Sequence, residues 1–372
     1  MTPHRRLRTA AILVAAIALS GCGSDDPLGH PWRPGGPGEP VENLYDGPVL
    51  RGQLEGAGSS AQESAMQAWI AGFQNIHAAA SVAYDPVGSG GGRTQFLEGG
   101  IQFGGSDAAL NHDELDRAAQ QCGEAGLAEL PLYISPIAVI FNLDGISELQ
   151  LTPATVARIF DRQVTRWDDP EIAADNPGVD LPDLLITPVA RSDESGTTEN
   201  FSEYLADAAG EAWPYPASGD WPVTGGQSAQ GNSGVVQTVT DGRGTVGYAD
   251  ASKAGALGTV KVKVGDDFVG YSPEAAAAIV AISPREEGRP EGSLVVELDR
   301  ETTEAGTYPI VLISYTLACR QYADPDEAAL VRAFLSYVAG EEGQQVSALT
   351  AGSAPISDAL RAEVQAVIDG IA

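Results

Sequence analysis

Strand-like apolar segments alternate with helix-like segments along nearly the whole chain, and this alternation limits the fold more than any other feature. The segment 48–60 has the character of a strand, and it precedes 61–80, where apolar residues recur at helical spacing. The same order returns where 184–193 precedes 195–209. Such alternation predicts an α/β fold with parallel sheets and right-handed crossovers. The long apolar run at 130–143 favours a buried strand of a parallel sheet.

Glycine- and serine-rich loops follow several of the predicted strands. Three of them, "VGSGGG" (87–92), "FGGSDA" (103–108) and "RSDESGTT" (191–198), fall at strand ends, and "EGAGSS" (55–60) precedes the first long helix. In open α/β sheets, ligands bind beyond the carboxyl ends of the strands. The convergence of these loops is the main functional signal in the sequence.

The loop that begins at Arg191 combines features of an anion site. Its arginine offers a planar fork of donors, and Asp193 lies close enough in sequence to hold that fork in place. A helix is expected to open near Thr197, and its first N–H groups would face outward beside the hydroxyl of Ser195 and the small Gly196. The alternative is a helix cap next to a surface arginine.

The other loops add further candidate donors and one acid. Ser60 and Ser89 each precede a helix and offer a hydroxyl, although either loop could be a plain turn. Asp107 would repel a fully deprotonated anion such as sulfate, but it could accept the proton of hydrogen phosphate. The alternative is that Asp107 caps the helix that follows.

The amino terminus predicts export and lipidation. Residues 1–21 hold three arginines and then the run "AILVAAIAL", which is shorter than the roughly 20 residues that span a bilayer. "LSGC" resembles a bacterial lipobox with Cys22 as the lipidated residue, and the alternative is a secreted protein with a chance cysteine. Residues 22–48 are rich in Gly and Pro and are expected to form a tether.

Cysteine count and net charge restrict the compartment and the partners. Without Cys22, the pair Cys122 and Cys319 remains, which predicts one disulfide in an oxidising compartment, or alternatively two buried thiols. The formal net charge is −30, and removal of the three signal arginines makes it −33. A chain this acidic is not expected to bind nucleic acid.

Signals for an enzyme are weak. Of the four histidines, His4 lies in the signal and His30 in the tether, while His77 and His112 lie in helical patterns. No G-x-S-x-G surrounds Ser195, and the sequence holds no P-loop, C-x-x-C or H-x-x-x-H pattern. We therefore expect a binding protein with no catalytic residues, no cofactor and no metal.

Eight segments together resemble, in order, the phosphate-binding lipoproteins (PstS) of bacterial phosphate-specific ABC transporters, in their actinobacterial form. They are "GAGSSAQESAM", "GSGGGRTQF", "FGGSDAAL", "PIAVIFNL", "TPATVARIFD", "RSDESGTTENFSEYL", "GNSGVVQTV" and "TYPIVLISYTLAC". The resemblance runs from about Gly56 to the end of the chain. It implies an α/β, two-lobed periplasmic-binding-protein fold (type II, Venus-flytrap) with one phosphate held in the cleft.

The resemblance also implies roles for individual residues. The implied phosphate contacts are Ser60, Ala61, Ser89, Asp107, Arg191, Ser195, Gly196 and Thr197. Asp107 would accept the phosphate proton, and Asp193 would orient Arg191. The family often has Thr-Phe where this chain has Ser60-Ala61, and a contact from the Ala61 backbone needs no particular side chain. Actinobacterial relatives also have cysteines at the positions of Cys122 and Cys319, which supports a bridge.

The expected function is capture of inorganic phosphate outside the cell membrane and delivery to an ABC transporter permease, with the chain anchored to the membrane by its lipid. Lobe 1 is expected to comprise 49–135 and 308–372, and lobe 2 to comprise 136–307. Alternatives are a binder of another tetrahedral oxyanion, a phosphate-binding surface sensor, or a phosphatase on the same fold.

Overall fold

The computed structural model describes residues 49–372, and the fold is built on one mixed sheet. The expected signal peptide, Cys22 and the tether all lie outside the described residues. Hydrogen-bonded neighbours follow the order β2-β1-β3-β11-β4-β8-β6-β7, and β9 pairs with β4, β5 and β10. The strands are β1 Gly52–Gly58, β2 Ala80–Asp85, β3 Phe103–Ser106, β4 Leu127–Phe141, β5 Glu148–Leu151, β6 Thr187–Arg191, β7 Gln227–Ala229, β8 Thr245–Asp250, β9 Gly258–Val264, β10 Asp267–Val269 and β11 Val311–Cys319.

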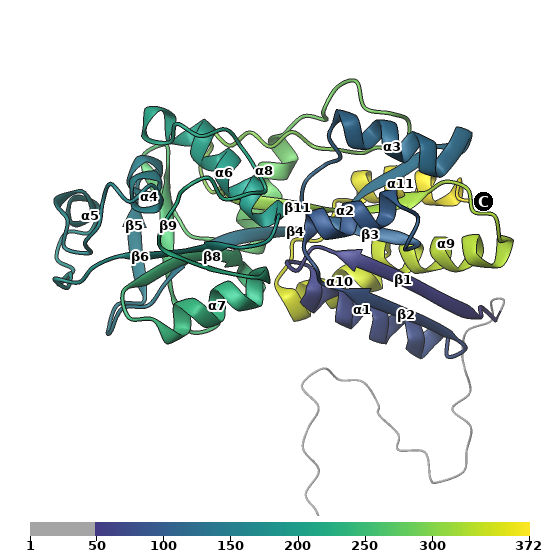
Figure 1. The fold of residues 1–372 in the computed structure, drawn as a ribbon, viewed down its shortest axis with the longest axis horizontal. Coiled ribbons are helices and arrows are strands. Elements are labelled where there is room, and N and C mark those ends of the chain that lie inside the picture. The colour runs from purple at the N-terminus through teal and green to yellow at the C-terminus, as the bar shows by residue number, and fades with distance from the viewer. Residues whose placement is uncertain (1–48) are drawn as a thin grey trace, which may run out of the picture. The chain divides into compact units, whose positions relative to one another are not determined.

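Two long strands, β4 and β11, join two lobes of this α/β fold (Figure 1). The first part of β4 pairs with β11, and its second part pairs with β8 and β9. All of these pairings are antiparallel, so the expectation of a parallel strand at 130–143 was wrong in direction. Every residue of β4 is buried. The apolar run reflects burial on both faces of the strand, and burial of this kind does not require parallel neighbours.

Each lobe contains a parallel group of strands beside the joining pair. In the first lobe, β1 pairs in parallel with β2 and β3, and β3 runs antiparallel to β11. In the second lobe, β6 pairs in parallel with β7 and β8. The parallel sheets predicted from the alternation are therefore present within each lobe. Strands β5, β9 and β10 have no counterpart among the strands expected from the sequence.

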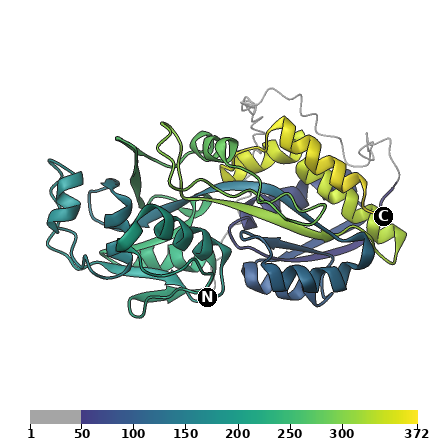
Figure 2. The ribbon, with the colours of Figure 1, turned by 90° about the horizontal axis from the view of Figure 1, so that it is seen from above.

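Helices cover the sheet on both faces. In the first lobe, α2 and α3 lie on one face, while α9, α10 and α11 lie on the other (Figure 2). Helix α1 packs against α10 and α9, so it belongs to the second of these layers. The helices are α1 Glu63–Ile76, α2 Ser89–Leu97, α3 His112–Cys122, α4 Pro153–Phe160, α5 Pro170–Asp175, α6 Gly196–Ala208, α7 Gly231–Asp241, α8 Pro273–Ile282, α9 Pro325–Ala339, α10 Glu341–Ala351 and α11 Asp358–Asp369.

Polar caps explain where several helices begin. Thr152 accepts from the N–H of Thr155 at the start of α4, as the threonine and the following proline predict. Asn111 forms a capping box with Glu114 at the start of α3. The alternative that Asp107 caps this helix is therefore wrong, because the chain runs on for several residues before the helix starts.

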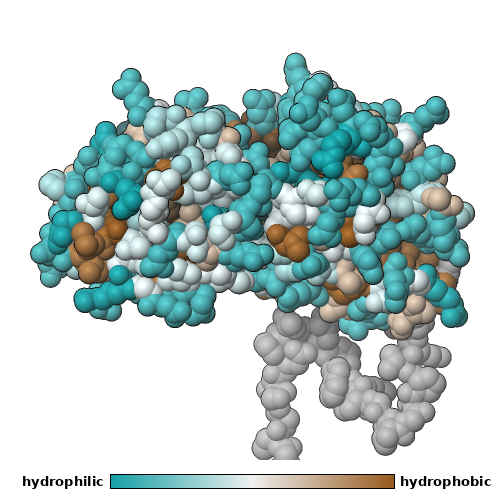
Figure 3. All heavy atoms as spheres, in the orientation of Figure 1, coloured by the Kyte–Doolittle hydropathy of each residue, from teal (hydrophilic) through white to brown (hydrophobic). Residues whose placement is uncertain are grey.

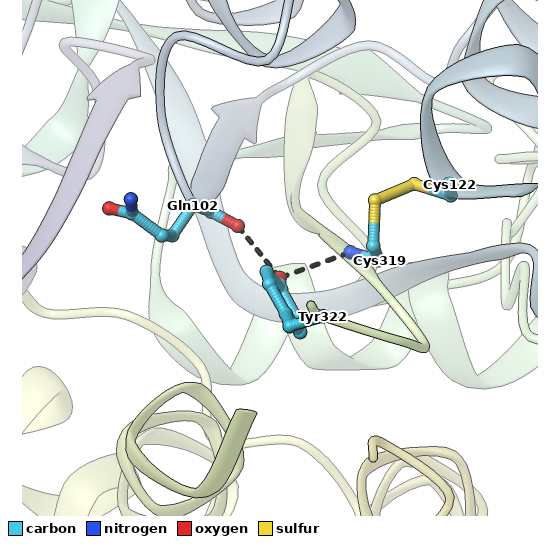
Figure 4. Close-up of a disulfide and its surroundings, with 4 residues drawn as sticks. All are labelled: Gln102, Cys122, Cys319 and Tyr322. Carbon is cyan, nitrogen blue, oxygen red and sulfur yellow. Dashed lines mark hydrogen bonds between the residues drawn. A yellow bond between two sulfur atoms is a disulfide. The ribbon is translucent and has the colours of Figure 1, made fainter. Parts of the chain in front are cut away.

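A disulfide ties α3 to the end of β11. The Cys122–Cys319 bridge links residues 197 positions apart, which confirms the predicted pairing. Beside it, the hydroxyl of Tyr322 accepts from the Cys319 N–H and donates to the Gln102 carbonyl (Figure 4). The segment between β11 and α9 is thus fixed to the residue that precedes β3, near the bridge.

The surface is largely polar. Hydrophilic residues cover most of the face in Figure 3, and hydrophobic ones form small groups between them. No helix within residues 49–372 has both the length and the apolar character required to cross a membrane. The core is apolar and holds large, fully buried side chains such as Trp69 and Trp167.

Candidate functional site

One wall of the candidate site is the turn from β6 into α6. Arg191 is the last residue of β6, and Ser195 is the N-cap of α6, with its Oγ accepting from the Thr198 N–H at 3.2 Å. The helix therefore starts at Gly196, one residue before the expected position. The N–H groups of the first helical turn lack partners inside the helix and carry the positive end of its dipole. This turn presents N–H donors and a guanidinium together.

Arg191 is buried and held by Asp193. Its Nε lies 2.8 Å from Asp193 Oδ1, and its Nη2 contacts Asp193 Oδ2, so the pair is bidentate. Burial acts to raise the pKa of Asp193, but the Arg191 guanidinium outweighs it and the pKa lies below its ordinary value. Asp193 Oδ1 also accepts from the Gly231 N–H at 3.1 Å. A carboxylate ionised in this way fixes the direction of the guanidinium.

The opposite wall comes from three loops of the first lobe. Ser60 and Ala61 follow β1, Ser89 is the first residue of α2, and Asp107 directly follows β3. All four are buried. Ser89 Oγ accepts from the Asp107 N–H at 3.1 Å, which links two of the loops. The Ala61 N–H donates to Ser59 Oγ at 3.0 Å, so this backbone donor has a partner inside its own loop.

The two walls meet at Thr197. Its Oγ1 donates to Asp107 Oδ2 at 3.1 Å and lies 3.5 Å from Arg191 Nη1. Gly196 packs so close to Ser89 and Asp107 that a Cβ at this position would collide with both. The structure thus brings Asp107 and Arg191 to opposite sides of the same hydroxyl, and glycine at 196 permits that approach.

One carboxylate oxygen of Asp107 lacks a hydrogen-bond partner within residues 49–372. Among the described residues, its Oδ1 has no hydrogen-bond partner, although the residue is only 3% exposed. Burial raises the pKa of the Asp107 carboxyl above its ordinary value, while the neighbouring hydroxyls of Ser59 and Ser314 and the charge of Arg191 act in the opposite direction. An unpaired buried oxygen costs free energy unless a partner reaches it. A ligand with a proton to donate would supply that partner.

The serine hydroxyls use their acceptor sites within the protein. Ser60 Oγ accepts from both the backbone N–H and the side-chain amide of Asn232, each at 3.1 Å. Ser89 Oγ and Ser195 Oγ accept from backbone N–H groups as described above. A hydroxyl has one donor and two acceptor sites, so each of these three retains its O–H for donation. Three donors beside an arginine suit an anion.

Asn232 belongs to the candidate site, although it was not expected from the sequence. It is fully buried at the start of α7, donates to Ser60 Oγ and to Thr197 Oγ1 (3.2 Å), and accepts from the Asp250 N–H at 2.8 Å. Its side chain joins the two walls. The segment "GNSGVVQTV" carried the signal, because it places a polar residue in the first turn of a helix that follows a strand.

Asn200 is a second missed residue, one turn into α6. Its side-chain amide donates to the Asp107 carbonyl at 2.7 Å and to the Gly196 carbonyl at 2.9 Å. Its Oδ1 accepts from Arg300, which is itself buried and also donates to the Pro309 carbonyl. These bonds fix the position of the Asp107 backbone. A cavity of about 620 Å³ lies beside them, lined in part by Asp107, Asn200 and His112.

Comparison with known proteins identifies relatives of similar length. A family model described as a PBP superfamily domain matches residues 47–342. Phosphate-binding protein PstS2 of Mycobacterium bovis is 33% identical over 327 residues, covering 86% of this chain and 87% of the relative. Phosphate-binding protein PstS 3 of Mycobacterium leprae is 33% identical over 374 residues, covering 97% of each. The solved structure of a phosphate-binding protein from Stenotrophomonas maltophilia is similar in fold, with a TM-score of 0.68 at 20% identity, covering 85% of this chain and 94% of that one.

Proposed function

Because the chain belongs to the PstS family of phosphate-binding proteins in the PBP superfamily, we propose that it captures inorganic phosphate outside the cell membrane and delivers it to an ABC transporter permease. The relatives named above are phosphate-binding proteins, and the present site has the donor chemistry that such a ligand requires. The phosphate would bind between the two lobes, and the closed state would be favoured because only there do both walls reach the ligand.

One observation carries the choice of ligand: Arg191 and Asp107 flank the hydroxyl of Thr197. Arg191 attracts an anion, while the unpaired Oδ1 of Asp107 requires a donor. Hydrogen phosphate meets both demands, since it is an anion that still holds a proton. Sulfate at neutral pH holds none and would face the carboxylate directly.

We assign the phosphate contacts to the two walls. The hydroxyls of Ser60, Ser89 and Ser195 would donate to phosphate oxygens, together with the first-turn N–H groups at Gly196 and Thr197. Arg191 would supply the charged contact, oriented by Asp193. The Ala61 N–H is the weakest member of the expected set, because it would have to leave Ser59 to reach the ligand.

Binding without chemistry is the activity proposed. Ser195 is a helix cap, its hydroxyl accepts from the Thr198 N–H, and within residues 49–372 no basic side chain bonds to it. The phosphatase alternative predicts turnover of a chromogenic phosphate ester, so a rate at the level of the buffer blank would exclude it. We further propose export by the signal peptide 1–21 and anchoring through lipidated Cys22, with 22–48 as the tether, and lobe limits at 49–135, 136–307 and 308–372.

Calorimetric titration of the purified chain with phosphate, arsenate and sulfate tests the proposal. We expect tight 1:1 binding of phosphate, similar behaviour for arsenate, which also retains a proton, and binding of sulfate that is weaker by several powers of ten. Equal affinity for sulfate would overturn the assignment of phosphate as the ligand. Absence of binding for all three anions would overturn the proposed function itself.

A further inference from the structure

A second arginine joins the lobes beside the anion site. Arg93 of α2 lies in the first lobe, and Glu194 lies in the turn from β6 to α6 of the second. Arg93 Nη2 is 2.7 Å from Glu194 Oε1, and the two side chains are 8% and 34% exposed. Glu194 sits between Asp193 and Ser195 in the chain, so this ion pair continues the wall of the site without belonging to the expected phosphate contacts.

Glu194 occupies a slot made by two glycines. A Cβ on Gly90, in the first turn of α2, would overlap the Glu194 carboxylate, and so would a Cβ on Gly219. Gly90 belongs to the first lobe and Gly219 to the second, so the carboxylate lies between them. The first turn of a helix also favours a negative charge. The slot is thus shaped and charged for this carboxylate in the lobe arrangement that the structure describes.

Arg93 is held in place by its own lobe. Its Nε lies 2.8 Å from Glu114 Oε1, and its Nη1 lies 3.0 Å from Ser106 Oγ, immediately before Asp107. These two bonds involve only the first lobe, so they do not depend on lobe closure. The third bond, to Glu194, joins the two lobes, so it would be lost if they moved apart. Because Arg93 is already fixed by its own lobe, its bond to Glu194 stabilises only an arrangement in which the two lobes are in contact.

We propose that Glu194 is a latch, a positioning residue that holds the closed state through Arg93 and the Gly90 slot and thereby slows release of the ligand. A contact made in the closed state but not in the open state shifts the equilibrium towards closure, even without ligand. The effect on phosphate release rests on the proposed function, whereas the effect on closure does not.

Two substitutions displace the latch by different routes. Glu194→Gln removes the charge, and Gly90→Ala fills the slot and expels the carboxylate. We expect each to weaken phosphate binding about tenfold, mainly through faster release measured by stopped flow. Gly90→Ala should leave the melting temperature unchanged or raised, because alanine favours a helix more than glycine does. That combination of results distinguishes a lost latch from general damage to the fold.

A double substitution and a matched control complete the test. In a Glu194→Gly background the slot holds no side chain, so adding Gly90→Ala should have no further effect on affinity. Glu171→Gln breaks an ion pair of similar length, Arg158–Glu171 at 2.8 Å, that lies within the second lobe, and it should leave release unchanged. If Gly90→Ala weakens binding equally with or without Glu194, the latch does not exist.

Closure can also be read without phosphate. Small-angle X-ray scattering of the ligand-free chain should give a larger radius of gyration for Glu194→Gln than for the unsubstituted chain or Glu171→Gln. If calorimetry finds no phosphate binding in the unsubstituted chain, the proposed function fails, and the scattering comparison still decides the latch. Identical scattering for all three chains would overturn it, whether or not release can be measured.

Discussion

Replacing Asp107 by asparagine tests the source of ligand selection. The carboxylate and the Arg191 guanidinium lie on either side of Thr197 Oγ1, at 3.1 and 3.5 Å from it. A sulfate placed between the walls would bring its negative charge close to Asp107 with no proton to share. Asp107→Asn keeps the shape of the side chain and an oxygen for Thr197, but it removes the negative charge. We therefore expect sulfate to bind more tightly and phosphate to lose an acceptor for its proton.

The size of the expected change in anion preference follows from the distance between the two negative charges. Two unit charges about 4 Å apart repel by about 4 kcal/mol at an effective dielectric constant of about 20, which corresponds to roughly a thousandfold in affinity. The burial of Asp107 means that little solvent screens this repulsion. The preference for phosphate over sulfate should narrow by up to this factor. Calorimetric titration with both anions in one buffer at pH 7.5 measures the ratio directly.

Asp193→Asn is the matched control, because Asp193 is the other acid of the same site. Its carboxylate contacts Arg191 and does not face the space between the walls. Its replacement should therefore weaken the binding of both anions, because the guanidinium is held less firmly. The ratio of the two affinities should then stay constant. An unchanged ratio in Asp107→Asn, or an equal change of the ratio in both variants, would refute the role given to Asp107.

Three further predictions concern stability and site geometry. Asn232→Ala leaves the buried Asp250 N–H without an acceptor, so the free energy of unfolding should fall by about 1–3 kcal/mol in chemical denaturation and phosphate affinity should fall with it. Burial raises the pKa of Glu199 from 4.5 to about 7, so the folded state holds this proton more tightly than the unfolded chain does. The free energy of unfolding should therefore decline as pH rises from about 4.5 to 7. In a pH series of denaturation curves, Glu199→Gln should remove about 3 kcal/mol of that decline. Replacing Cys122 and Cys319 together by serine should lower the free energy of unfolding by about 3–5 kcal/mol, since the bridge closes a long loop, while phosphate affinity measured by calorimetry stays the same.

The order of strands and helices was largely predictable from the sequence because local patterns set it. A threonine followed by proline marks the start of α4, and the loop "EGAGSS" was expected to precede the first long helix, which is α1. The direction of β4 was not predictable in this way. A strand buried on both faces has the same apolar pattern whether its neighbours run parallel or antiparallel, and only the long-range pairing with β11 decides.

The candidate site was predictable where one loop carries several polar features, and not where a single residue contacts the opposite wall. The turn from Arg191 to Thr197 combines an arginine, an acid and a helix start, so its chemistry is visible locally. Asn232 contacts Ser60, and Arg93 contacts Glu194, in each case more than a hundred residues away in the chain. In the sequence each looks like an ordinary polar residue of a helix. Their roles depend on tertiary contacts that sequence spacing does not encode.

The local charges explain how so acidic a chain can hold an anion. Asp193 is paired with Arg191, and Glu194 is paired with Arg93. The negative charges of these two acids near the site are therefore balanced by neighbouring arginines. Burial raises the pKa of Asp107, which favours sharing a proton over bearing an unpaired buried charge. The remaining negative charge is spread over the rest of a chain with a formal net charge of −30 and cannot attract phosphate from a distance. We therefore expect capture to depend on short-range donors at two helix starts and on closure of the lobes around them. Residues that stabilise the closed state should then affect affinity as strongly as those that touch the ligand.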